Sequence, residues 1–430
     1  MMNGSANHGW ISYHPDSRSW FLHVIRGEGP FLYTPERTII SVGNWKKEFR
    51  VINEEPLKEM ISTKISYRRN MNGFYPGPFM GILTVEGKNH FKGVRENFID
   101  LIEEGKKEGA FVYVVPIEKI HWKKQWVTGY LYDSRTKKWC KEILPFPHVF
   151  YNRIPSRKEE EKKHVQLALK KLAMQKKTVL FNPHFFDKAS IFEVLRYHSS
   201  IRYLLPETRY FQTAKDLEVM IRKYPFIYLK PLKGMAGKGI YRLEKNKTDF
   251  LLKYQQGKET LQRAFSSFDE TLTYLQERCK IPYLIQQGIP LAQYKNKAFD
   301  FRLLVQKNGV GKWGLTGVGI RLSGEGNITT HVPRGGSIQS PKEILPMVFP
   351  NTKSQLIMEQ LKGIALTITK VLESKWPTLG EVSMDIGMDH NGHFWFFEAN
   401  SKPGKFDEPT IRKPSLHNLI HYSQYLFNLP

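Results

Sequence analysis

The stretch that decides the fold spans residues 380–400 and reads GEVSMDIGMDHNGHFWFFEAN. Asn391-Gly392 lies between two alternating runs, which predicts a two-residue hairpin turn of type I′ with positive φ at both positions. This turn pairs Asp385 with Glu398 and Ser383 with Asn400, and alternation puts all four side chains on one face. The opposite face is expected to enter the core, with Met384, Ile386, Met388, Trp395, Phe397 and Ala399.

The predicted pairing places two carboxylates directly opposite each other. Like charges in that position repel, so a cation between them or protonation of one of them is needed. Asn400 adds a neutral oxygen next to Asp385 and Glu398. An all-oxygen set of this kind suits Mg²⁺ or Mn²⁺. The alternative is a surface carboxylate pair neutralised by lysines of the chain.

A second segment combines a strand that ends in lysine with a glycine loop. Residues 226–231 read FIYLKP and are followed by LKGMAGKG, so Lys230 closes a strand and the loop leads into another strand. The loop is neither a P-loop nor a dinucleotide fingerprint, because Gly239 follows Lys238 where Ser or Thr is required and no helix follows. Its backbone N–H groups could still cover phosphates above Lys230. The alternative is an ordinary glycine-rich hairpin with a solvated lysine.

Two further strands carry polar residues. Residues 283–290, YLIQQGIP, form an apolar strand whose backbone could meet an adenine edge. Residues 299–305, FDFRLLV, put Asp300 and Arg302 on one face, either as an ion pair or with the arginine directed at a phosphoryl group.

Composition excludes several classes of protein. Hydrophobic residues are 40% of the 430 residues, without a low-complexity tract, which is typical of a globular protein. Two cysteines, Cys140 and Cys279, cannot form a disulfide framework. The sequence shows no Ser-His-Asp elbow, no His-Glu-x-x-His and no zinc-type spacing. The polar residues 1–15 lack the apolar core of a signal peptide, and no membrane-spanning run occurs, so we expect a cytoplasmic protein.

The charge is strongly positive and uneven. The chain has 65 Lys and Arg against 41 Asp and Glu, a net charge of +24. Residues 1–150 hold 22 basic and 16 acidic residues, whereas residues 151–430 hold 43 and 25. This excess indicates anionic partners or, equally, an ordinary basic surface.

Three regions are expected along the chain. Residues 1–75 read as a small, mostly β domain. Residues 79–155 alternate strand and helix, as in a small doubly wound α/β domain. Residues 156–430 form the largest region, with a glycine-loop subdomain at about 200–285 and the carboxylate hairpin in a subdomain at about 286–430.

The order of these motifs resembles the ATP-grasp superfamily, and more narrowly its endospore coat-associated YheC/YheD branch. The resemblance covers residues 79–405. The superfamily motifs are Asp187-Lys188, Leu205-Pro206-Glu207-Thr208, Lys230-Pro231, the glycine loop, Gln286-Gln287, Asp300-Phe301-Arg302, Asp385 and Glu398-Ala399-Asn400; the branch motifs are residues 81–84, 150–155, 181–183 and 398–404.

This resemblance implies an ATP-grasp fold of two α+β subdomains gripping ATP, preceded by the two smaller domains. It implies a Mg²⁺- and ATP-dependent carboxylate–amine ligase acting through an acylphosphate. Lys188 and Lys230 would contact the phosphates, and Asp385, Glu398 and Asn400 would bind Mg²⁺ or Mn²⁺. Arg302 and Arg321 would face the phosphoryl group or the acyl substrate, with Lys230 also catalytic. The lid would hold Gly234, Ala236, Gly237 and Gly239, and the adenine strand Gln286, Gln287 and Ile289.

Two other functions compete with the ligase. One is an idle nucleotide-binding or structural protein of the spore coat, in or around the mother cell of a sporulating bacterium. The other is a basic binder of an acidic polymer; nucleic acid is a poor candidate because no recognition motif is present. No motif specifies the acid or the amine, which could belong to a peptide or protein.

Overall fold

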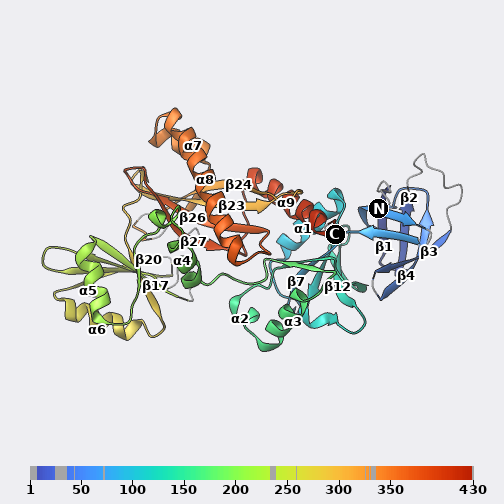
Figure 1. The fold of residues 1–430 in the computed structure, drawn as a ribbon, viewed down its shortest axis with the longest axis horizontal. Helices are drawn as coiled ribbons and strands as arrows, with labels where there is room; N and C mark the ends of the chain where they lie inside the picture. Colours follow the sequence, from blue (N-terminus) through green and yellow to red (C-terminus); the bar gives the residue numbers. More distant parts are fainter. Residues whose placement is uncertain are drawn as a thin grey trace.

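A computed structural model describes residues 7–24, 36–42, 44–70, 73–232, 239–257, 259–324, 326–328, 330 and 336–428. Four large sheets organise this part of the chain into an elongated molecule (Figure 1). One end carries the N-terminal strands, and the other carries the sheet covered by α5 and α6 (Figure 1).

The first sheet contains only strands, in the order β3-β4-β2-β1-β5-β6. The middle of β2 is buried on both faces, whereas on β4 buried Trp45 and Phe49 are separated by more exposed residues. The strands are β1 Asn7–His14, β2 Ser19–Val24, β3 Arg37–Val42, β4 Trp45–Ile52, β5 Ile61–Asn70 and β6 Gly73–Gly77.

The second sheet has a parallel centre, β10-β7-β14-β15, with an antiparallel meander at one edge. Its strands are β7 Phe79–Thr84, β10 Phe111–Pro116, β11 Ile120–His121, β12 Trp126–Asp133, β13 Lys138–Pro145, β14 Val149–Asn152 and β15 Val179–Phe181, and its helices are α1 Arg95–Glu108, α2 Arg157–Glu160 and α3 Lys163–Ala173. Short strands β8 Glu86–Gly87 and β9 His90–Phe91 pair with each other. Because β15 belongs here, this sheet extends to Phe181, beyond the boundary expected at residue 155.

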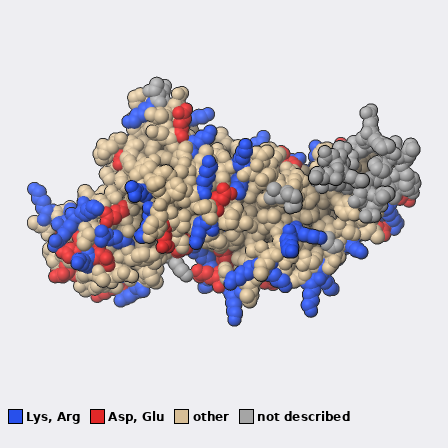
Figure 2. All heavy atoms as spheres, in the orientation of Figure 1, with Lys and Arg blue, Asp and Glu red and all other residues tan. Residues whose placement is uncertain are grey.

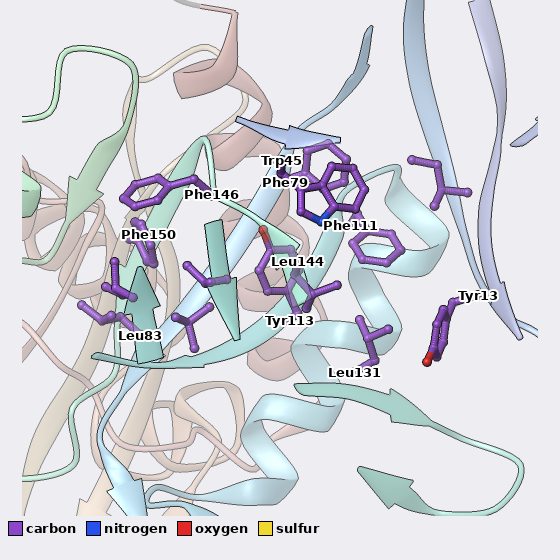
Figure 3. Packing of buried hydrophobic residues seen from close by; sticks show 14 of the residues in the cluster. Tyr13, Trp45, Phe79, Leu83, Phe111, Tyr113, Leu131, Leu144, Phe146 and Phe150 are labelled. Atoms are coloured by element: carbon purple, nitrogen blue, oxygen red, sulfur yellow. The ribbon is translucent and has the colours of Figure 1, made fainter. Parts of the chain in front are cut away.

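One hydrophobic core joins the first two sheets. The rings of Trp20 and Phe111 lie 5.9 Å apart, and Trp45 donates its indole N–H to the carbonyl of Ile143. Figure 3 shows Trp45 of the first sheet with Phe79 and Phe111 of the second, and Tyr13 of the first sheet on the side of Leu131. The boundary expected near residue 75 therefore falls within a shared core.

The third sheet is antiparallel, in the order β16-β21-β17-β18-β19-β20. It contains β16 Thr208–Tyr210, β17 Phe226–Pro231, β18 Tyr241–Lys245, β19 Phe250–Gln256, β20 Glu259–Phe265 and β21 Tyr283–Gln287, with α5 Ala214–Lys223 and α6 Phe268–Arg278. A capping box between Thr213 and Asp216 begins α5, and its apolar side packs Leu217, Met220 and Ile221 into the core of this sheet.

The fourth sheet has the order β25-β24-β23-β26-β27, with β22 pairing with β23. Its strands are β22 Gln293–Tyr294, β23 Lys297–Lys307, β24 Trp313–Leu322, β25 Ser337–Gln339, β26 Glu381–Met388 and β27 Phe394–Asn400, and the helices of this region are α4 Lys188–Arg196, α7 Pro341–Val348, α8 Asn351–Lys375 and α9 Pro409–Phe427. Helix α9 contacts β23 and β24 and also α1, so it links the fourth sheet to the second (Figure 1).

Candidate functional site

The carboxylate hairpin forms, but its turn differs from the predicted type. Asp389 receives a hydrogen bond from the N–H of Gly392 at 3.0 Å and donates its own N–H to the carbonyl of His393. Gly392 has φ of 87°, whereas Asn391 is not among the residues with positive φ. The loop therefore holds three residues, His390, Asn391 and Gly392, with glycine in the left-handed position.

This longer loop shifts the pairing by one residue near the turn, where Met388 lies opposite Phe394 and Ile386 opposite Phe396. A bulge between Asp385 and Ile386 shifts it back. Asp385 therefore does pair with Glu398, and Ser383 with Asn400, as predicted. The prediction is right because the two irregularities cancel.

The bulge also changes which aromatic residues face the core. Phe394 and Phe396 are buried there, while Trp395 and Phe397 lie on the carboxylate face, so the expectation for those two residues is wrong. Phe397 packs closely over β26, because a Cβ at Gly387 would lie 2.5 Å from its ring. Its ring centre is 5.6 Å from the Lys230 amine. In the sequence, two residues separate Phe396 from Ala399, whereas strict alternation puts one residue between neighbouring core positions. This spacing is the sequence feature that indicates the bulge.

Each of the opposed carboxylates has a cation of the chain as a partner. Arg321 contacts Oδ2 of Asp385 at 2.8 Å, and Lys188, at the first position of α4, lies 3.5 Å from Oε2 of Glu398. Asn400 donates its amide to Glu398 at 3.3 Å, which orients its oxygen away from that carboxylate. The alternative considered for this pair, neutralisation by basic residues, is thus present in the structure.

Arg321 is buried between two aspartates. It binds both oxygens of Asp300, at 2.8 and 2.6 Å, and Thr330 donates its hydroxyl to the same residue. Burial alone would lower the pKa of Arg321, but Asp300 and Asp385 outweigh it and raise that pKa. Arg321 therefore pairs with carboxylates of the fold, and Asp300 pairs with Arg321 rather than with Arg302.

Arg302 lies on β23 opposite Asp385 of β26. Its guanidinium is 5.0 Å from the centre of the Phe406 ring, beside Gly404. A pocket opens next to this pair, and its lining includes Tyr151, Arg153, Glu381, Gly404, Phe406 and Arg412. Neither predicted arginine lines this pocket, but Arg302 contacts two residues that do, Gly404 and Phe406.

Lys230 is held by polar and aromatic neighbours at the end of β17. Its amine donates to Oε1 of Gln286 at 2.5 Å and lies 5.5 Å from the centre of the Tyr228 ring. Burial, with repulsion from Lys188, lowers the pKa of Lys230 to about 8, although Glu398 and Asp385 oppose the shift. The two lysines and the two carboxylates therefore form one electrostatic cluster, which an anionic ligand would stabilise.

The predicted adenine strand, β21, already uses part of its hydrogen-bonding capacity within the third sheet. Gln287 donates its N–H to the carbonyl of Glu207 at 2.8 Å, and its side-chain oxygen accepts from the N–H of Glu207. Its backbone donor is thus already used, contrary to expectation. Gln286 is buried between Lys230 and Thr208 and acts through its side chain. Ile289 is buried beyond the strand end.

Glu207 is a residue that the sequence analysis gave no role. Its carboxylate accepts from Tyr224 at 2.7 Å and pairs with Lys223 and Arg209. Burial would raise the pKa of Glu207, but these partners outweigh it and lower that pKa. Only its place in the motif at residues 205–208 indicated it, because a surface glutamate has no distinctive spacing.

Most of the predicted glycine lid lies outside the described residues: Gly234, Ala236 and Gly237. Gly239 is described, with φ of 72°, and its carbonyl accepts a hydrogen bond from Tyr283 at 3.0 Å. This bond ties one end of the loop to β21, the predicted adenine strand.

The donor set on the hairpin fits a hard divalent cation. Asp385, Glu398 and Asn400 offer three oxygens on one face. Arg321 approaches Asp385 at Oδ2, 2.8 Å away. Ser383 shares this face, and its buried hydroxyl has no hydrogen-bond partner among the described residues. A metal-bound water would satisfy that hydroxyl.

The protonation of Asp385 gives a first prediction. Burial, opposed by Arg321 and reinforced by Glu398, raises the pKa of Asp385 to about 6. The native state thus binds this proton more tightly than the unfolded chain, so stability falls as pH rises from about 4 to 6. In EDTA, wild type should lose up to about 3 kcal/mol relative to Asp385→Asn across this range. Urea unfolding at each pH measures the difference, and parallel curves would show that Asp385 is an ordinary carboxylate.

Comparison with known proteins agrees with this geometry. Residues 177–426 match the family described as YheC/D-like ATP-grasp. The endospore coat-associated protein YheD of Bacillus subtilis (strain 168) is 31% identical over 369 residues, which is 81% of this chain and 79% of YheD. The coat-associated protein YheC of the same organism is 23% identical over 65% of this chain and 77% of YheC.

Among solved structures, D-cycloserine synthetase DcsG aligns with a TM-score of 0.48 at 10% identity, over 81% of this chain and 99% of that protein. None of the helices in the described part of the chain has the length and apolar character needed to cross a bilayer. The match over residues 177–426 and the identity to YheD assign the fold, and the chain belongs to the YheC/D-like ATP-grasp family.

Proposed function

We propose that this protein is a Mg²⁺- and ATP-dependent carboxylate–amine ligase. The observation that carries the proposal is the convergence of Lys188, Lys230, Asp385 and Glu398 in one cluster, although they come from α4, β17, β26 and β27. A scaffold gains no stability from opposed carboxylates or from a lysine buried beside another lysine. Destabilising arrangements of charged groups such as these are typical of sites that bind charged ligands.

In this proposal, the nucleotide lies between the third and fourth sheets. Lys188 and Lys230 bind its phosphates, and the loop with Gly234, Ala236, Gly237 and Gly239 covers them. Ile289 and the carbonyl of Gln287 border the adenine. This placement relieves the repulsion between the two lysines and the desolvation of Lys230.

Asp385, Glu398 and Asn400 would hold Mg²⁺ or Mn²⁺, with Ser383 hydrogen-bonded to a coordinated water. The cation would neutralise the negative charge that develops on the phosphates during phosphoryl transfer. Arg321 holds Asp385 and Asp300 in place through its ion pairs with them, so we assign it as a positioning residue. Lys188 is free to turn from Glu398 toward phosphate, because that ion pair is partly exposed and therefore weak.

The proposed reaction has two steps. A substrate carboxylate oxygen bonds to the γ-phosphorus as the bond to the β-phosphate oxygen breaks, and ADP leaves. An amine then attacks the acyl carbon and loses a proton, and phosphate leaves. Arg302, which contacts Phe406 and Gly404 of the pocket wall, would hold the acyl substrate by its negative charge.

An idle nucleotide-binding coat protein is the second candidate. It is favoured by the contact of Arg321 with Asp385, which neutralises the carboxylate without a metal. The names of the relatives YheD and YheC refer to the spore coat and to no reaction. Release of ADP with a pool of carboxylates and amines, followed by mass spectrometry, separates the two candidates.

Binding of an acidic polymer is the third. Figure 2 shows lysines and arginines spread over the visible face, with acidic residues among them, rather than gathered in one stripe. This distribution favours a generally basic surface, to which a polymer would bind without a defined site.

The proposal predicts that Mg²⁺ and ATP together stabilise the protein. A ligand that binds only the native state adds about 2.7 kcal/mol at a hundredfold excess over Kd. The melting temperature should rise with millimolar ATP and Mg²⁺, and EDTA should remove most of the rise. An unchanged melting temperature at millimolar nucleotide would refute the nucleotide site.

A further inference from the structure

A second cluster of metal-ligand side chains lies where the end of α1 meets α9. Helices α1 and α9 pack against each other (Figure 1). Glu108 is the last residue of α1, and His417 and His421 lie one turn apart on α9. The sequence shows no zinc-type spacing, because Glu108 is some 300 positions away from the two histidines.

The three side chains converge on one point. His421 Nε2 is 2.9 Å from Oε2 of Glu108, and His417 Nδ1 is 3.6 Å from the same oxygen. The ligand atoms of all three residues lie within 4.8 Å of one another. In a tetrahedral zinc site, ligand atoms are roughly 3.3 Å apart. Small side-chain rotations would bring these three to that spacing.

The surroundings hold the cluster in place. The two imidazole rings are 3.9 Å apart, centre to centre. Gln424 of α9 donates to the backbone carbonyl of Glu108, and Arg412 of α9 binds Asp100 of α1 at 2.6 Å. The backbone near both ends of the site is therefore fixed before any ligand binds, which lowers the entropic cost of binding.

The charge of Glu108 also needs a partner. A carboxylate at the last residue of a helix lies at the negative end of the helix dipole, which is unfavourable. His421 and His417 face this carboxylate, at 2.9 and 3.6 Å. A divalent cation held by this carboxylate and the two imidazoles would compensate the charge.

We propose that Glu108, His417 and His421 form a binding site for a late first-row divalent cation, best Zn²⁺. Two imidazole nitrogens and one carboxylate oxygen are ligands typical of zinc and leave a fourth position to water. His417 and His421 are partly exposed, at 47% and 34%, so the ion can enter from solvent. Bound there, the ion clamps the C-terminal helix to the second sheet's helix α1.

The test is Zn²⁺ binding by calorimetry, without nucleotide, to wild type, His417→Ala, His421→Ala and Glu108→Gln. We expect one site that each of these changes weakens by at least about tenfold. His164→Ala is the matched control, because His164 also lies beside a single glutamate, Glu118, at 3.3 Å. Asp385→Asn should bind Zn²⁺ at this site like wild type, which separates it from the proposed nucleotide site.

Two further measurements keep the proposal falsifiable if a variant is unstable. Co²⁺ added to wild type should give the visible absorption of a low-symmetry site with nitrogen ligands, and His421→Ala should lose it. Zn²⁺ should raise the melting temperature of wild type but not of His421→Ala. The proposal is overturned if wild type binds no Zn²⁺ at micromolar concentrations, or if both histidine variants bind it like wild type.

Discussion

Glu398→Gln is expected to reduce ADP formation by at least about a hundredfold while nucleotide binding remains measurable. The amide keeps one oxygen but loses the charge opposite Asp385, so the cation is held less well where phosphate charge develops. Lys188, Lys230 and the adenine strand are unchanged. Initial rates of ADP release with Mg²⁺ and a carboxylate–amine pool, beside fluorescence titration with nucleotide, separate the two effects.

The same substitution tests whether Glu398 is structural. In EDTA, Glu398→Gln should be as stable as wild type or slightly more so, because it removes repulsion with Asp385, and the ion pair with Lys188 is partly exposed. Glu193→Gln, an exposed position on α4, serves as the matched control. A marked loss of stability in EDTA would identify Glu398 as an ion-pair partner required by the fold.

Lys230→Met should weaken ATP binding about 10- to 100-fold, because a desolvated ammonium group contributes about 1.5–3 kcal/mol to a phosphate contact. The fold should survive with a small change in melting temperature. Removing the buried charge relieves desolvation, whereas Gln286 loses the donor to its buried oxygen, and the two effects oppose each other. Calorimetry with ATP and Mg²⁺ measures the affinity.

Lys253→Met is the control for Lys230→Met. Lys253 lies in the same sheet and pairs with Glu244 at 3.0 Å, outside the cluster. Its substitution should leave ATP affinity within about twofold of wild type. If Lys230→Met binds ATP as tightly as wild type, the glycine loop has been assigned to the wrong role.

The hairpin shows how far sequence reasoning reaches. The pairing of Asp385 with Glu398 could be predicted from a turn signal and strand alternation. The three-residue loop and the bulge could not, because both depend on which aromatic side chains fit the core beside Met384 and Ile386. For the same reason Phe397, which lies beside Lys230, was assigned to the wrong face.

The pairing between strands that are distant in the sequence could not be predicted either. Asp300 and Arg302 share a face by spacing, but Asp300 bonds to Arg321 because β23 and β24 place them directly opposite. The use of the Gln287 N–H by Glu207 likewise depends on β16 lying beside β21. Spacing within a strand predicts which side chains share a face. Which strand lies next to it in the sheet depends on the topology of the whole fold.

The most direct test of the central claim is the location of the metal. A crystal grown with Mn²⁺ and a non-hydrolysable ATP analogue should show an anomalous peak coordinated by Asp385 and Glu398, next to the analogue's phosphates. The amine of Lys230 should contact the same phosphates. A bound nucleotide with no manganese peak between these carboxylates, and with Glu398 still paired to Lys188, would contradict the account.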